Sequence, residues 1–385
     1  MNYLGRRFCN RCIYDSNVSA IFFDGNGVCN YCHQVERLKE EYGTGTDQGD
    51  RRFKEIIADA KKTGRGKQYD CIVGVSGGTD SSYMVYMLRE RGLRPLAVHY
   101  DNTWNTSVST LNIYRVLKHF DVDLFTHVVS NTEADDIFRA FFLAGVPEID
   151  ASTDLGYAWV LRQAAHRYNI KYIFEGHSFV EEGITPLANN YFDGRYIMDI
   201  HERYGSETLN TYPLMTLGRF LRSSVLSGVR FVRPFWYVRY SKDEARRFLE
   251  DECGWQYYGG HHLENRMAAF AHTVYLPRKF STDLRNNTLA AQVRNGRLDR
   301  DSAIGEYLMN VVVDPDLIDY FKRRLGFTDI EYEQIMEQPP RSWTEFRTYK
   351  RQFELLAPLF FVLAKTNRVP MSFYIKYCKQ QQEIR

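Results

Sequence analysis

The sequence has no apolar stretch long enough to cross a membrane. Its densest apolar run, "LLAPLFFVLA" at residues 355–364, is short and contains a proline, whereas a spanning helix needs about 18 or more apolar residues. The N-terminus has polar and basic residues followed by cysteines, without the apolar core of a signal peptide. We therefore expect no membrane association and a cytoplasmic location.

The chain also has little net charge. Its 50 Lys and Arg against 48 Asp and Glu give a formal net charge of +2, which disfavours a nucleic-acid partner. The 385 residues, 44% hydrophobic and 25% charged, suit a soluble globular enzyme of roughly two or three domains. The aromatic share of 15% fits either rings that stack on a ligand or an aromatic core.

Four of the seven cysteines form two matched pairs. Cys9 and Cys12 make one Cys-x-x-Cys turn, and Cys29 and Cys32 make the other, with sixteen residues between them. Each turn brings two thiolates together, and two turns close the tetrahedron of a structural zinc site. Because disulfides are rare in the cytoplasm, we predict a structural Zn²⁺ ion; a redox pair is the alternative.

Strand-like and helix-like segments alternate in the middle of the chain. Buried strands are predicted at residues 71–75, 95–100, 124–129, 172–176 and 229–238, and helices at 79–91, 107–119, 132–144 and 154–168. This alternation indicates an α/β fold with a doubly wound parallel sheet that binds ligands at the carboxyl ends of its strands.

A polar, glycine-rich linker and a change from alternating strands and helices to mainly helices divide the chain. "GTGTDQGDRR" follows the cysteines, and the pattern becomes mainly helical after about residue 240. We predict a zinc ribbon at 1–45, a nucleotide-binding domain at 50–240, and a helical C-terminal extension for substrate or partner binding at 241–385.

The turn "SGGTDSS" at residues 76–82 joins the first buried strand to a helix. Glycines let backbone N–H groups approach an anion closely, and a helix N-terminus adds a positive dipole. The hydroxyls of Ser76, Ser81 and Ser82 can donate to phosphate oxygens. Asp80 cannot bind phosphate directly, so we predict that it binds a Mg²⁺ ion that bridges phosphates. No Gly-Lys-Ser/Thr follows, which excludes a Walker A loop.

This turn resembles the SGGxDS motif of the PP-loop ATP pyrophosphatases. The resemblance implies that the loop binds the β,γ-pyrophosphate of ATP while a substrate oxygen attacks the α-phosphate. It also implies an ATP site that consists of Val75, Ser76, Gly77, Gly78, Thr79, Asp80, Ser81, Ser82, Tyr100 and Asp101. The segment "RPFWYVRYSKDEA" at 233–245 is similar to the fifth strand and following helix of these proteins.

Several branches of that superfamily need cysteines that this chain lacks. Cys71, Cys253 and Cys378 stand in none of the contexts of a glutaminase nucleophile. Sulfur-inserting enzymes need reactive cysteines near the nucleotide, but only Cys71 is near the loop, and it lies in a buried strand where thiols are usually inert.

A longer series of motifs narrows the resemblance from the superfamily to one family. After the cysteine pairs and the loop come "LAVHYDNTWNT", "STDLG", "EGHSFVEEGITP", "YYGGHHLENRMAAF", "LPRKFSTDLR" and "VPMSFYIKY". From Cys9 to about Tyr377 this order resembles the N-acetyl sugar amidotransferase family of surface-polysaccharide biosynthesis. Those enzymes convert the N-acetyl group of an activated sugar to an acetamidino group with ATP and ammonia. The chain departs from the family pattern at 154–156, 177–178 and 261–265.

The resemblance implies roles for individual residues. Such chemistry needs positive charge beside the phosphates, a hydrogen-bond donor to the developing oxyanion and a base that takes a proton from ammonia. We expect catalytic roles for Asp80, Glu182, His262, Glu264 and Lys279, with His262 or Glu264 as the base. We expect substrate contacts from Trp104, Asp154, His177 and Arg285. Each residue has a structural alternative: a helix-start acid for Glu182, an N-cap for Asp154, burial for Trp104 and His177, and a solvated face for Lys279 and Arg285.

The function expected from the sequence is ATP-dependent amidotransfer to an N-acetylated, UDP-linked sugar in O-antigen or other surface-polysaccharide biosynthesis, with release of AMP and pyrophosphate. ATP, Mg²⁺ and structural Zn²⁺ are the expected cofactors. Because the chain lacks a glutaminase cysteine, we expect a glutaminase and an ammonia-channel protein as partners. A PP-loop tRNA-thiolating enzyme and a non-catalytic nucleotide-binding scaffold are the alternatives.

Overall fold

The computed structural model describes residues 2–3, 5–184, 191–260 and 263–378. At its centre lies a five-stranded, fully parallel sheet with the order β5-β4-β3-β6-β7. Its strands are β3 (Cys71–Gly74), β4 (Pro95–Asp101), β5 (Leu124–Val128), β6 (Tyr172–Phe174) and β7 (Arg230–Val232). The chain moves outward from β3 to β5 and then returns to place β6 on the other side of β3. This reversal confirms the predicted doubly wound α/β sheet.

The predicted last strand is shorter than expected. It was predicted at 229–238, but β7 ends at Val232, and Pro234–Trp236 forms the 3₁₀ turn η2. Proline has no N–H to donate to a strand neighbour, so the sheet pairing stops before it.

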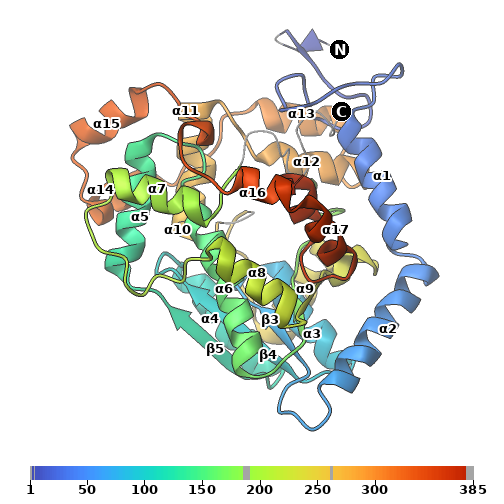
Figure 1. Ribbon diagram of the computed structural model, residues 1–385. Coiled ribbons are helices and arrows are strands. Elements are labelled where there is room, and N and C mark those ends of the chain that lie inside the picture. The colour runs from blue at the N-terminus through green and yellow to red at the C-terminus, as the bar shows by residue number, and fades with distance from the viewer. Residues whose placement is uncertain (1, 4, 185–190, 261–262, 379–385) are drawn as a thin grey trace.

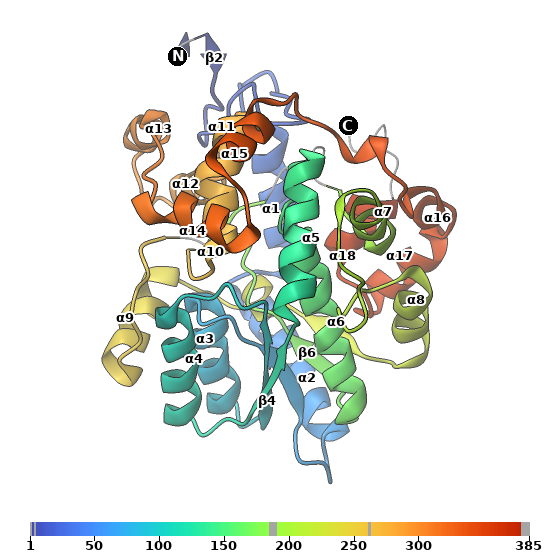
Figure 2. The same cartoon turned by 90° about the vertical axis from the view of Figure 1, so that its left-hand side faces the viewer.

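Helices cover both faces of the sheet. They are α2 (Asp47–Thr63), α3 (Thr79–Glu90), α4 (Ser107–His119) and α9 (Lys242–Cys253) on one face, and α5 (Asn131–Ala144) and α6 (Ala151–Arg167) on the other. Side chains of β3 alternate between the layers: Val73 packs with the first group, and Ile72 packs with the second. Figure 2 shows α3 and α4 on one side of the strands and α5 and α6 on the other.

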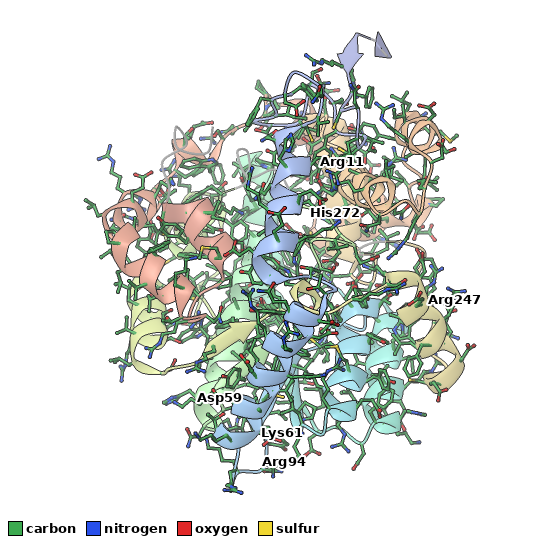
Figure 3. All side chains as sticks on the ribbon, turned by 90° about the vertical axis from the view of Figure 1, so that its right-hand side faces the viewer. Arg11, Asp59, Lys61, Arg94, Arg247 and His272 are labelled. Atoms are coloured by element: carbon green, nitrogen blue, oxygen red, sulfur yellow. The ribbon has the colours of Figure 1, made fainter. Side chains whose placement is uncertain are left out.

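The cysteine segment packs on C-terminal helices and not on the sheet. It contains the short antiparallel pair β1 (Asn2–Tyr3) and β2 (Arg6–Arg7) and ends in α1 (Asn30–Tyr42). Its buried side chains contact Leu289 and Ala290 of α12 (Arg285–Arg294) and Ile304 of α13 (Arg300–Leu308). Helices α1 and α2 then run one after the other down one side of the molecule to the sheet layers (Figure 3).

The remaining C-terminal elements form two groups. One joins α5 through a shared aromatic core and contains α10 (Arg266–Phe270), the π-helical turn η3 (Ala271–Tyr275), α11 (Leu276–Phe280), α14 (Pro315–Leu325) and α15 (Asp329–Glu337). The other packs around α8 (Leu217–Leu226) and contains α16 (Lys350–Leu355), α17 (Ala357–Lys365), α18 (Met371–Phe373) and the π-helical turn η5 (Tyr374–Cys378). Helix α7 (Gly194–Tyr204) packs on α5, and η4 (Trp343–Glu345) precedes α16.

These groups confirm the predicted helical C-terminal region and the N-terminal four-cysteine segment (Figure 1). The three domain ranges 1–45, 50–240 and 241–385 stay a prediction. Among the helices that the structure describes, none is long and apolar enough to span a membrane.

Candidate functional site

A pocket of about 1040 Å³ lies between the carboxyl edge of the sheet, the cysteine segment and the C-terminal helices. Its sheet end is lined by Gly74 at the end of β3, by Val75 and Ser76 after it, and by His99 and Tyr100 of β4. Ligand pockets usually measure about 300–1,000 Å³, so this one has room for a nucleotide and a second substrate.

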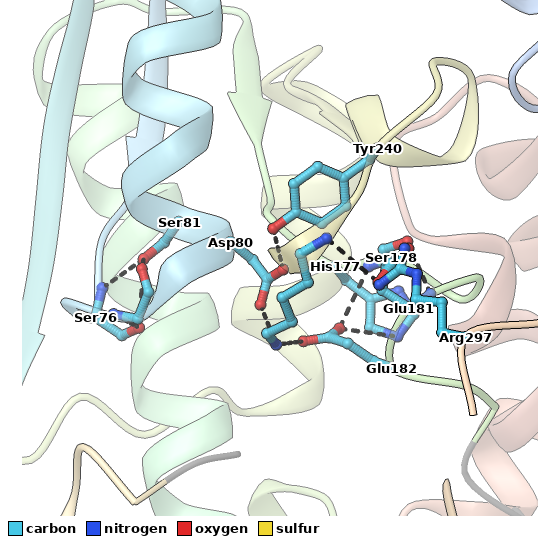
Figure 4. Close-up of polar contacts among 11 residues, drawn as sticks. Ser76, Asp80, Ser81, His177, Ser178, Glu181, Glu182, Tyr240 and Arg297 are labelled. Atoms are coloured by element: carbon cyan, nitrogen blue, oxygen red, sulfur yellow. Dashed lines mark hydrogen bonds and ion pairs between the residues drawn. The ribbon is translucent and has the colours of Figure 1, made fainter. Parts of the chain in front are cut away.

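The loop after β3 has the form of an anion-binding turn. Helix α3 begins directly after it, and its N-cap, Gly78, supplies no side-chain cap. Gly77 has φ +84°, and a Cβ atom there would lie 2.3 Å from the carbonyl oxygen of Ser109, so only glycine fits. The hydroxyls of Ser76 and Ser81 lie 3.4 Å apart beside the helix start (Figure 4). Backbone N–H groups and hydroxyls therefore gather where a phosphate would bind.

A cluster of charged side chains stands next to this loop. The Tyr240 hydroxyl donates to Asp80 Oδ1 at 2.6 Å, and Lys242 Nζ donates to Asp80 Oδ2 at 2.6 Å. The same ammonium lies 3.5 Å from Glu182 Oε1, and His177 Nε2 lies 3.8 Å from Glu182 Oε2 (Figure 4). Burial alone would lower the pKa of Lys242, but the charges of Asp80 and Glu182 outweigh it and raise the pKa well above its usual value. Lys242 is therefore cationic at neutral pH.

The Mg²⁺ ion on Asp80 stays a prediction, because such an ion takes most of its ligands from phosphates and water and only one or two from carboxylates. Both carboxylate oxygens of Asp80 already accept a hydrogen bond, and the Lys242 ammonium lies between Asp80 and Glu182. Within the described ranges, the four cysteines are the one group of three or more potential donors whose ligand atoms converge. Lys242 places a positive charge between these two carboxylates.

Sequence reasoning missed Lys242 and Tyr240. The segment "RPFWYVRYSKDEA" was recognised as the fifth strand and its helix, but its side chains were given no role. The sequence contained a signal for Lys242. Ser241 is the N-cap of α9, so Lys242 is the first residue of a helix at the sheet edge where parallel strands bind ligands.

Most predicted residues of the loop and the acidic cluster line the pocket. They are Val75, Ser76, Gly78, Asp80, Ser81, Tyr100, Asp154, His177, Glu182 and Glu264. Glu264 is 8% exposed, and its Oε1 would lie 3.4 Å from a Cβ on Gly78. It is therefore placed beside the loop after β3.

Four of the predicted ATP-binding residues do not line the pocket. Gly77 packs on Ser109, and Thr79 and Ser82 are buried inside the first turn of α3. Asp101 accepts hydrogen bonds from the Thr103 N–H and from Asn105, so its carboxylate shapes the turn after β4.

Trp104 does not have the expected stacking role. Its ring is fully buried, its indole N–H donates to Asp135 at 2.8 Å, and the Arg324 guanidinium lies 4.2 Å above the ring. No face of the ring is left for adenine or sugar.

Lys279 and Arg285 also differ from expectation. The Lys279 ammonium donates to the backbone carbonyls of Ile335 and Gln338, and burial lowers its pKa. Arg285 pairs with Asp283 and donates to backbone carbonyls of Tyr307 and Met309. Both cations hold C-terminal segments together and do not line the pocket. His262 lies outside the described residues.

The four cysteines meet in one buried cluster. Their sulfur atoms all lie within 4.8 Å of one another, with Cys9–Cys32 at 3.9 Å and Cys12–Cys29 at 3.8 Å. Zn–S bonds of about 2.3 Å put tetrahedral sulfur atoms about 3.8 Å apart. The donor set therefore fits one tetrahedral metal ion. Arg300 donates to the carbonyls of Cys9 and Cys12 and fixes the first turn on α13.

Comparison with known proteins agrees with part of this description. Residues 264–359 match a family model described as "LPS biosynthesis protein WbpG-like, C-terminal domain". Over that segment the match confirms the resemblance to surface-polysaccharide biosynthesis. No curated protein matches the chain.

The chain is also similar to several solved structures. The NH3-dependent NAD synthetase from Campylobacter jejuni shares 13% identity over 76% of this chain and 98% of its own, with a TM-score of 0.31. The U34-tRNA thiolase NcsA from Methanococcus maripaludis was solved with a 4Fe-4S cluster. It shares 12% identity over 83% of this chain and 98% of its own, with a TM-score of 0.30. The NMN synthetase from Francisella tularensis shares 13% identity over 58% of this chain and 92% of its own, with a TM-score of 0.27. At such low scores we draw no functional conclusion from them.

The four-cysteine cluster predicts the effect of losing one cysteine. The purified protein should contain about one zinc ion per chain, and Cys29→Ser should lower the metal content and the unfolding temperature together, because structural zinc supplies folding energy. Elemental analysis and thermal unfolding measure both, with Cys253→Ser as the control outside the cluster. Iron with a cluster absorbance would contradict a zinc site.

The charged cluster predicts a strong effect of Lys242→Met. Turnover of ATP should fall about 10²–10³-fold, the usual cost of removing one group that stabilises developing charge, while circular dichroism stays unchanged. Arg247→Met on the same helix is the control, since Arg247 points to solvent (Figure 3). Turnover within about twofold of wild type in the Lys242 variant would exclude a catalytic role.

Proposed function

We propose that this protein is an ATP-dependent amidotransferase that converts the N-acetyl group of a nucleotide-linked sugar to an acetamidino group. The observation that carries the proposal is the anion-binding loop beside Lys242 at one end of a pocket large enough for two substrates. The family match of residues 264–359 supports surface polysaccharides as the context.

In the first step the acetamido oxygen attacks the α-phosphorus of ATP. A P–O bond forms, the bond to the β,γ-pyrophosphate breaks, and the substrate becomes an O-adenylated imidate. Loop N–H groups and the hydroxyls of Ser76 and Ser81 bind the leaving pyrophosphate, and Lys242 neutralises part of its growing charge. Asp80, which accepts from the Tyr240 hydroxyl, and Glu182 orient Lys242 for this task.

In the second step ammonia adds to the imidate carbon. The nitrogen loses a proton, the C–O bond to AMP breaks, and the amidine remains. Glu264 is the proposed base, because it lines the pocket beside the loop and within the field of Lys242. His177 and Asp154, which also line the pocket, are proposed substrate contacts.

Two alternative functions have less support. A thiolating enzyme needs a reactive cysteine near the nucleotide, but no described cysteine lines the pocket, and burial raises the pKa of Cys71 far above its usual value. A non-catalytic scaffold would not need Lys242, Asp80 and Glu182 grouped next to an intact loop.

The products test the proposal. Incubation with ATP, ammonium and a panel of UDP-linked N-acetyl sugars should yield AMP, pyrophosphate and a sugar whose mass is lower by about one unit, as expected when oxygen is replaced by NH. Mass spectrometry and nucleotide chromatography measure both. ADP as the product would contradict the adenylation step, and absence of an amidine with every sugar would contradict amidotransfer.

The nitrogen source predicts a partner. Since no described cysteine lines the pocket, we propose that a glutaminase and an ammonia-channel protein supply ammonia, which is mostly protonated at neutral pH. The protein alone should use ammonium, better at alkaline pH, and should not use glutamine. Assays with each nitrogen source measure this. Efficient glutamine use by the isolated chain would contradict the need for a partner.

A further inference from the structure

The segment between the two cysteine pairs forms part of the pocket wall. Asp15, Asn17, Val18 and Ser19 line the pocket, and so do Asp283, Asn286, Asn287 and Tyr307 from the region of α12 and α13. The cysteine segment and these helices lie at the opposite end of the molecule from the sheet (Figures 1 and 2). The pocket therefore has a second end, which the phosphate loop does not reach.

This wall is held in one shape. Asp15 is buried, its Oδ1 accepts from the Asn17 N–H at 2.7 Å, and its carbonyl accepts from the Val18 N–H at 3.0 Å. The Tyr31 hydroxyl donates to the Ser19 carbonyl at 2.6 Å, which ties the segment to α1. These bonds to backbone groups fix the wall, and the side chains of Asn17 and Ser19 make no hydrogen bond to another described residue.

The wall contains a side-chain amide oxygen that lacks a hydrogen-bond donor among the described residues. Asn286 Oδ1 is buried and has no hydrogen-bond partner among the described residues. Buried polar atoms normally have a partner, and this side chain lines the pocket. The oxygen itself is closed off from solvent, so a ligand N–H or O–H group would reach it once the amide turns toward the pocket.

The two ends of the pocket are connected by direct contacts. Glu182 joins Lys242 at the loop end, and the next residue, Gly183, lies so close to α12 that a Cβ would be 2.7 Å from the Asn287 carbonyl oxygen. A substrate bound at the loop can thus extend past Glu182 to Asn286 and Ser19.

We infer that the wall of Asn17, Ser19 and Asn286 binds the nucleoside of the nucleotide-linked sugar, an inference that rests on the proposed function. The acetamido group must reach the α-phosphate of ATP at the loop, so the carrier end points toward this wall. Amide and hydroxyl side chains match the N–H and C=O edge of a base such as uracil. A lipid carrier would need an apolar wall.

The test measures binding of UDP, UDP-N-acetylglucosamine and a non-hydrolysable ATP analogue by calorimetry. Asn286→Leu removes the N–H and C=O groups of the side-chain amide at similar volume, and Ser19→Tyr fills the space at the wall. Both should weaken UDP and UDP-sugar binding about tenfold or more and leave the ATP analogue within about twofold. Ser16→Tyr, at an exposed position of the same segment that does not line the pocket, is the matched control. Zinc content checks that each variant keeps its metal site.

Unchanged UDP affinity in both variants would overturn the inference, as would a wild-type protein that binds no UDP or UDP-sugar. Loss of the ATP analogue alone would also overturn it and assign the wall to ATP. These results are independent of the amidine assay. An amidine with unaltered UDP binding in the variants contradicts only the nucleoside site, and no amidine from any sugar contradicts the proposed function.

Discussion

The ammonium of Lys242, held between Asp80 and Glu182, is the interaction on which the site depends. Asp80 lies in the first turn of α3, Lys242 opens α9, and Glu182 stands in the segment after β6. Parallel strands all end at the same edge, so these three segments meet although they are far apart in sequence. A cation shared by two carboxylates is fixed in place, yet phosphate oxygens can still compete for it.

The local patterns of the sequence predicted those parts of the structure that depend on neighbouring residues. The Ser-Gly-Gly turn is set by Gly77, whose positive φ other residues avoid, and the cysteine cluster is set by two Cys-x-x-Cys turns. The parallel sheet followed from the alternation of strands and helices. Each of these features is encoded within one short segment or one regular pattern.

Contacts between distant segments could not be predicted in this way. Trp104 stands next to a strand end, but Arg324 and Asp135 cover it from two other helices. Lys279 and Arg285 are cations in a family motif, yet carbonyl groups of α15 and of the segment after α13 bind them. Whether a charged side chain faces a pocket or fixes a helix depends on packing, and no spacing rule contains that information.

The cysteine cluster is linked to the charged site through a short series of contacts. Tyr14, two residues after Cys12, places its hydroxyl 2.7 Å from the carbonyl oxygen of Ile184 and 2.7 Å from Asn287 Oδ1. Ile184 follows Glu182 by two residues. The turn that carries Cys12 therefore helps to set the position of Glu182.

A second set of contacts fixes the same segment from its other side. Arg297, which follows α12, pairs with the buried carboxylate of Glu181, and Glu181 also accepts from the Lys242 N–H. Glu182 is thus held between the cysteine segment and the C-terminal helices, and its distance to Lys242 depends on both. The four-cysteine cluster, far from the sheet, therefore contributes to the charge balance beside the loop after β3, because it helps to position the backbone segment that carries Glu182.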